Sequence, residues 1–192
     1  MTSAARPGGS QDVVIAQEGA GVVLKGPFNP AMFSPLWFSE AQLVGASELE
    51  DTELGLISPV ETRFRLSWLE VVVTQDTFQL TTSQVEEFPR LRDAAIGVLR
   101  TLEHQPLAAI GVNREVHAQV RSSDDMHRIG DAIAPKKYWQ DVLGFPAVRT
   151  VHMWGTRPDN LGGRVNVRVE PSVLFSPAVF VSVNDHYNLE QL

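Results

Sequence analysis

The chain has 192 residues, of which 43% are hydrophobic and 20% charged, so it can form a packed core and is not expected to be disordered. Its formal net charge of -7 disfavours nucleic acid as a partner, because proteins that bind nucleic acids usually carry a basic excess. The absence of cysteine excludes disulfides, thiol nucleophiles and thiolate metal sites.

The first twelve residues, MTSAARPGGSQD, predict a flexible N-terminal tail. They lack the apolar stretch of a signal peptide, and no apolar run in the chain approaches the roughly 20 residues that cross a bilayer. We therefore expect a protein that does not enter the membrane and acts in the cytoplasm.

The stretch Val13–Gly26 predicts two short strands around a glycine-rich turn at Gly19 and Gly21. It lacks the Gly-Lys-Ser/Thr ending of a phosphate-binding loop, so no nucleotide site is expected there. No other cofactor motif was found in the sequence, and we expect no cofactor.

An aromatic-rich segment covers residues 28–45. Ser34 can cap a short helix whose first residue is Pro35. This pattern favours a helix pinned to the core. The alternative is a patch that grips a partner or a second subunit through Phe28, Phe33, Trp37 and Phe38.

Residues 48–55 are expected to form a solvated acidic connector. From Glu61 to Ser83 the composition predicts a β-hairpin with its turn at Thr74–Thr77. A helix is expected after this hairpin, and Ser83 is its expected N-cap, in a capping box with Glu86.

The main helix is expected between Ser83 and His104, with its true start near Phe88 because Pro89 suits a first turn. Pro106 should end it. Its inner face is an apolar stripe at helical spacing, formed by Leu91, Ala94, Ala95, Val98, Leu99 and Leu102.

The stretch Leu107–Val120 predicts a central strand with one apolar and one polar face. Asn113, Glu115 and His117 share the polar face, whereas Arg114 lies among the apolar residues. An arginine on a core face must reach solvent or meet a carboxylate, so we expect it to pair with an acid, with Asp93 and Asp131 as first candidates.

A second helix is expected between Ser122 and Gly144, capped by Ser123 or Asp124 and stopped by Pro135. Its inner face is formed by Met126, Ile129, Ala132 and Ile133. The last 50 residues predict three strands, and in the middle one Arg164, Asn166, Arg168 and Glu170 share the polar face.

Together these elements predict an α+β fold: a single domain over residues 13–192, with a mostly antiparallel sheet of about five to seven strands and two main helices on one face. No zinc-binding helix motif and no nucleophile elbow is found in the sequence. We expect no metal site.

Three functions remain open. The favoured one is a non-enzymatic protein-binding or assembly module that self-associates and uses the aromatic patch, Asn113, Arg164 and Arg168. A small hydrolase could instead use Glu115, His117 and His186 with a divalent metal. A nucleic-acid accessory protein would use a basic stripe of Arg63, Arg65, Arg164 and Arg168.

Several runs carry a resemblance that spans nearly the whole chain from Phe28: FNPAMFSPLWFSEAQLV, LRDAAIGVL, AIGVNREVH, IGDAIAPKKYW, GTRPDN and VEPS with VSVNDHYNL. These runs resemble a group of bacterial proteins to which no activity is assigned. The order of elements is similar to that of a sporadic bacterial family with a fold like the export chaperone SecB. That resemblance implies an oligomeric, client-binding protein without enzymatic activity.

Overall fold

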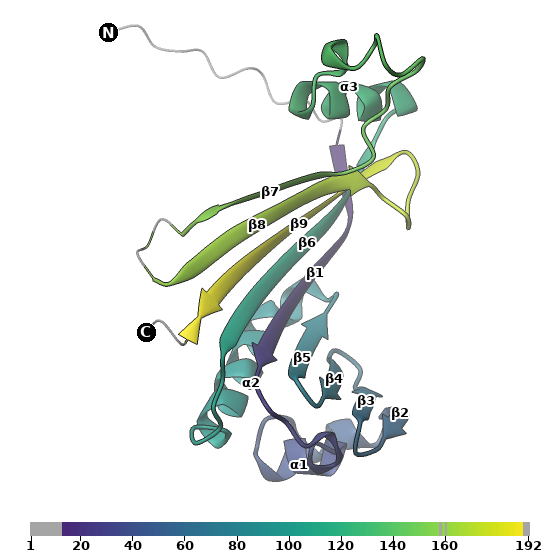
Figure 1. The fold of residues 1–192 in the computed structure, drawn as a ribbon. Coiled ribbons are helices and arrows are strands. Elements are labelled where there is room, and N and C mark those ends of the chain that lie inside the picture. Colours follow the sequence, from purple (N-terminus) through teal and green to yellow (C-terminus); the bar gives the residue numbers. More distant parts are fainter. Residues whose placement is uncertain (1–12, 158, 160, 190–192) are drawn as a thin grey trace, which may run out of the picture. The chain divides into compact units, whose positions relative to one another are not determined.

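The computed structural model describes residues 13–157, 159 and 161–189, so the predicted tail of residues 1–12 lies outside the described part. The described chain forms one antiparallel sheet in the order β2-β3-β4-β5-β1-β6-β9-β8-β7 (Figure 1). The strands are β1 (Val13–Lys25), β2 (Glu53–Ile57), β3 (Glu61–Arg65), β4 (Glu70–Thr74), β5 (Thr77–Thr82), β6 (Ala109–Val120), β7 (Val151–Thr156), β8 (Gly163–Pro171) and β9 (Ala178–Asn188).

Three α-helices accompany this sheet: α1 (Pro35–Glu40), α2 (Phe88–Thr101) and α3 (Ser123–Ile133). Short 3₁₀ helices cover Pro30–Met32, Ala46–Leu49, Val85–Glu87 and Lys136–Tyr138. The predicted α+β class and the antiparallel sheet are confirmed, whereas the predicted five to seven strands are too few.

The chain divides into two compact units. One contains the described residues within 18–115, 152–167 and 182–189, and we call it the core unit. The other contains the described residues 13–17, 116–151 and 168–181, and we call it the α3 unit. The single domain expected over residues 13–192 stays a prediction.

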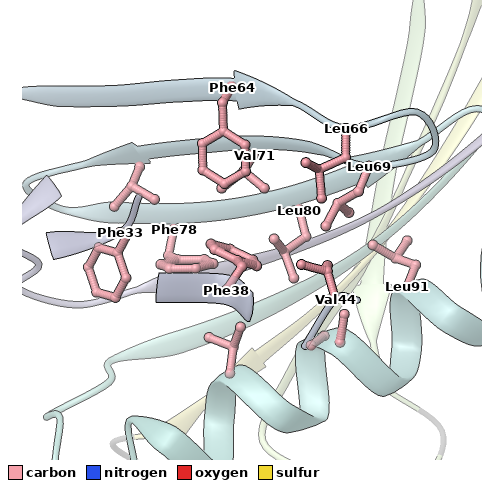
Figure 2. Close-up of a cluster of buried hydrophobic side chains, with 14 of the residues drawn as sticks. Phe33, Phe38, Val44, Phe64, Leu66, Leu69, Val71, Phe78, Leu80 and Leu91 are labelled. Carbon is pink, nitrogen blue, oxygen red and sulfur yellow. The ribbon is translucent and has the colours of Figure 1, made fainter. Parts of the chain in front are cut away.

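The main hydrophobic core lies in the core unit, between β3, β4 and β5 on one side and α1 and α2 on the other (Figure 2). Phe38 of α1 is fully buried and contacts the rings of Phe64 and Phe78, with ring centroids 5.3 and 6.1 Å apart. Leu91, Ala94, Ala95 and Val98 bury the inner face of α2, as the apolar stripe predicted. α2 packs on β5.

The aromatic-rich segment belongs to this core, and its proposed role as a partner-binding patch is corrected accordingly. Phe28, Phe33 and Phe38 are buried and Trp37 packs against them, so their side chains face the protein interior. The predicted cap is confirmed, because the Ser34 hydroxyl accepts a hydrogen bond from the Trp37 backbone N–H, and Pro35 is the first helical residue.

β1 is one strand of 13 residues and not the predicted hairpin. Gly19 lies within the continuous strand and makes room for a neighbouring side chain. A Cβ atom at Gly19 would lie 2.6 Å from the Oε1 atom of Glu115 on β6. The glycine therefore serves close cross-strand packing and not a turn.

The prediction of an acidic connector over residues 48–55 is wrong in two ways. Residues 53–57 form the edge strand β2, and the side chain of Glu48 is only 19% exposed. Its carboxylate pairs with Arg90 on α2, accepts a hydrogen bond from Trp68 Nε1 at 2.8 Å and another from the Gly45 N–H at 2.6 Å. The strand predicted from Glu61 is also broken, because Leu66 and Leu69 close a turn between β3 and β4.

The predicted capping box of the main helix is wrong. α2 begins at Phe88, as Pro89 indicated, but Glu87 is its N-cap and makes no side-chain hydrogen bond to it. A 3₁₀ turn over Val85–Glu87 precedes the helix, so Ser83 lies too far upstream. In α3 the cap is Ser122, one residue before the predicted one, and its hydroxyl accepts from the Asp125 N–H.

Glu48 should make stability depend on pH. Burial raises the pKa of this carboxyl, but hydrogen bonds from Arg90, Gly45 and Trp68 together outweigh burial and hold the pKa below its usual value. Because the folded pKa is depressed, the stabilisation is present above the unfolded pKa of about 4.3 and is lost as the pH falls through the folded value.

We predict that Glu48→Gln lowers the free energy of unfolding at pH 7 by about 1–2 kcal/mol and flattens its decline below pH 5, measured by urea denaturation across pH. Glu50→Gln, an exposed neighbour, is the matched control and should change neither quantity. An unaltered acid limb in the Glu48 variant would contradict the assignment.

Candidate functional site

An apolar groove of about 500 Å³ lies in the core unit, between α2 and the strands β1 and β6. Ala20 and Val22 of β1 line one part of it, and Ile110 and Val112 of β6 line the next. The flank of α2 completes it with Phe88, Arg92, Ile96 and Leu99. We call this concavity the α2 groove.

The groove exists because α2 uses one face for the core and a second face for the groove. Ala94 and Val98 face the core alone, and the buried Leu91 and Ala95 also border the groove. Arg92, Ile96 and Leu99 repeat at i, i+4 and i+7 along the adjoining flank. Ile96 remains 39% exposed and Val112 37% exposed, so no described side chain fills the space between them.

Arg114 lies at the groove, on the same strand face as Ile110 and Val112, as its place among the apolar residues predicted. The predicted ion pair is wrong. Asp93 pairs with Arg92 at 2.6 Å and Asp131 with Lys136 at 2.8 Å. The guanidinium of Arg114 lies instead over the Phe88 ring, 4.4 Å from its centroid, and the side chain reaches solvent.

The electrostatics of the groove favour an anion at one end. Arg92 and Arg114 both line it, next to Phe88 and Pro89 in the first turn of α2. Arg92 shares its charge with Asp93, whereas no ion pair to Arg114 is found within the described residues. Arg114 is therefore the cation that is left for a ligand.

A ladder of three asparagines accompanies the groove in the core unit. Asn166 on β8 donates to Asn184 on β9 at 3.0 Å, and Asn184 donates to Asn113 on β6 at 2.8 Å. These cross-strand bonds align three neighbouring strands, since each amide can donate and accept. The expected partner-binding residue Asn113 thus has bonded neighbours within the sheet.

His117 lies in the α3 unit and is buried, so the prediction that it belongs to a solvated polar face is corrected. Its ring contacts Phe180, with centroids 4.7 Å apart, and its Nδ1 lies 2.8 Å from the Ser172 Oγ. The same oxygen accepts the N–H groups of Leu174 and Phe175. Ser172 therefore donates its proton to Nδ1, which places the ring proton on Nε2.

The pair of Ser172 and His117 has a structural role. Both lone pairs of the hydroxyl are occupied by backbone N–H groups, so the oxygen is not free to attack a substrate. Glu115 is exposed and lies over Gly19, and His186 is half-buried on β9. In the described part of the chain no three histidine or carboxylate side chains could hold a metal ion together.

The proposed basic stripe is largely neutralised by local pairs. Arg63 pairs with Glu61 at 3.2 Å, and Arg65 pairs with Glu70 at 3.4 Å. Arg168 pairs with Glu170 at 3.6 Å and lies over the Phe180 ring. Arg164 is exposed on β8.

A cluster around Arg157 was not predicted from the sequence. Arg157 is 7% exposed in its side chain and donates to Asp159 and, at 2.8 Å, to Asp185 on β9, while it stacks on Tyr187 at 3.9 Å. The hydrogen bonds from Arg157 hold the pKa of Asp159 below its usual range, and the pKa of Arg157 is raised. Every group in the cluster has a partner, so the cluster ties Arg157, which follows β7, to β9.

No protein-family model and no curated protein matches the chain. Nowhere in the described part is there a helix both long and apolar enough to cross a bilayer.

We predict that Ser172→Ala destabilises the protein by about 1–2 kcal/mol in urea denaturation, because the N–H groups of Leu174 and Phe175 and the His117 ring lose a shared partner. Ser83→Ala is the control and should change stability by less than about 0.5 kcal/mol, since Ser83 is exposed and caps no helix. Equal effects of the two substitutions would refute the structural role of Ser172.

Proposed function

We propose that the chain is a non-enzymatic protein-binding module, and that its α2 groove holds an apolar segment of a partner protein. The observation that supports this most strongly is the open apolar groove with a cation, Arg114, at its edge. Ile96 and Val112 would lose their exposure to water when such a segment binds, and burial of apolar surface is the main driving force of association.

The net charge of the protein and the charge at the groove limit the kind of partner segment that can bind. The protein carries a net charge of -7, so an acidic partner would be repelled at a distance. Within the groove, however, Arg114 offers positive charge. A segment with several apolar side chains and a single carboxylate beside them satisfies both conditions.

Self-association is a second part of the proposal, and the edge strand β2 supports it. All five residues from Glu53 to Ile57 are exposed, with Leu54 at 65% and Ile57 at 44%. Leu54 lies opposite the buried Phe64 and Ile57 opposite the buried Thr62, so both extend the core face of the sheet beyond the core. An apolar edge of this kind is a template for pairing with another strand.

The resemblance in element order to the SecB-like family implies the same class of function, an oligomeric protein that binds other proteins. We propose action in the cytoplasm, without a cofactor and without nucleic acid as a partner. Asn113, Arg164 and Arg168 remain proposed secondary contacts, because all three lie on strands and retain access to solvent.

The groove can be tested with peptides selected on the protein by phage display. We expect the enriched peptides to be apolar with one acidic residue. Arg114→Gln and Ile96→Glu should each weaken their binding about tenfold or more, because the first removes the cation and the second places an opposing charge in the groove. Fluorescence anisotropy with the labelled peptides measures the dissociation constants.

Arg100→Gln is the matched control, since Arg100 is exposed on α2 but does not line the groove. It should leave peptide binding unchanged. Enriched peptides that bind all three variants as tightly as the wild type would place the binding site elsewhere.

Self-association has its own test. We expect light scattering to give an oligomer for the wild type and a shift towards monomer for Leu54→Lys, because a lysine on an edge strand opposes pairing. Leu36→Lys, which changes an exposed leucine on α1, should behave as the wild type. A wild type that is monomeric at all concentrations would refute self-association through β2.

A further inference from the structure

A cavity of about 180 Å³ lies beneath α3, within the α3 unit. Met126, Ile129 and Ile133 of the helix form one wall. The opposite wall is formed by Val148, Val169 and Val179. The cavity is therefore lined mainly by aliphatic side chains from four separate segments of the chain.

This pocket is partly open to solvent, because most of its lining residues are half-buried or exposed, yet its volume exceeds ordinary gaps between packed side chains. Cores pack about as densely as organic crystals, with few voids larger than a water molecule. A cavity lined by aliphatic groups does not hold water, because water finds no hydrogen-bond partners there, and one of about 150 Å³ engineered in another protein binds benzene. The pocket beneath α3 has a similar volume and mainly aliphatic walls, but it is partly open and also borders Lys136 and Glu170.

The packing of α3 shows that its apolar face lacks a complete partner. Met126, Ile129 and Ile133 follow helical spacing, as the sequence predicted for the inner face, yet α3 has no buried residue. Ile133 is 38% exposed. A molecule in the cavity would supply the missing dispersion contacts to this face.

The charged groups at the cavity are already paired. Lys136 pairs with Asp131 at 2.8 Å. The Glu170 carboxylate accepts a hydrogen bond from Thr150 at 3.1 Å and lies 3.6 Å from Arg168. A ligand with its own charge would find no opposite charge to pair with and would lose its hydration, so the cavity favours a neutral molecule.

We propose that this cavity is a binding site for a small neutral apolar molecule, the size of one aromatic ring or a comparable branched aliphatic group. His127, the remaining polar side chain of the lining, is exposed and can bond one polar atom of the ligand. The site lies in the α3 unit, so it is independent of the α2 groove and of the function proposed for that groove.

The test is a titration of the ¹³C-methyl-labelled full chain with benzene, followed by NMR. We expect chemical-shift changes concentrated on the methyl groups of Met126, Ile129, Ile133, Val148, Val169 and Val179. Benzoate, which has the same ring and a charge, should bind about tenfold more weakly or worse.

Val169→Phe should fill the cavity and weaken benzene binding about tenfold or more. Val167→Phe is the matched control, because Val167 lies two residues away on the same half-buried face of β8 and does not line the cavity. This variant should bind benzene as the wild type does.

Absence of shifts at the cavity methyl groups in the wild type, or equal benzene binding by the two phenylalanine variants, would overturn the proposal. Benzoate that binds as tightly as benzene would overturn the neutral class of ligand. If Val169→Phe does not fold, the wild-type titration decides the question by itself.

Discussion

The packing of α2 against β5 is the interaction on which the rest of the core unit depends. Four apolar residues of the helix, from Leu91 to Val98, close the core over the strands that carry Phe64 and Phe78. Because α2 packs on β5, its adjoining flank lies beside β1 and β6 and does not fill the space above these two strands. The α2 groove is therefore a consequence of where the helix finds its best apolar partner, and not a separate feature added to the fold.

Arg114 has a part in both the packing of the groove and its proposed function. An apolar side chain at this position would extend the row of Ile110 and Val112 and leave this wall of the groove without a charged group. The arginine instead stacks on Phe88 and keeps its charge in solvent, so one end of the groove carries a positive charge. A groove with an apolar floor and one cation can orient a bound segment, whereas an apolar groove alone can only bury it. The cavity beneath α3 is also mainly apolar, but its charged groups, Lys136 and Glu170, are already paired.

Periodicity predicted the elements whose burial follows from a single pattern. The stripe of α2, the proline near its start, the Ser34 cap and the three C-terminal strands all came from local rules. Local rules failed where tertiary contacts decide. Gly19 looked like a turn because its contact with Glu115 is invisible in the sequence, and Glu48 looked solvated because Arg90 and Trp68 are far along the chain. The same holds for the site: the face of Arg114 was predictable, but its stacking on Phe88 and the Arg157 cluster were not.

The central claim is that a partner segment lies in the α2 groove with its carboxylate at Arg114. Intermolecular nuclear Overhauser effects between a display-selected peptide and the methyl-labelled protein test this claim most directly. The account predicts cross-peaks from the leucine and valine methyl groups of the peptide to Ile96, Ile110 and Val112. Cross-peaks confined to the β2 edge or to the α3 unit, with none to these three residues at saturation, would contradict it.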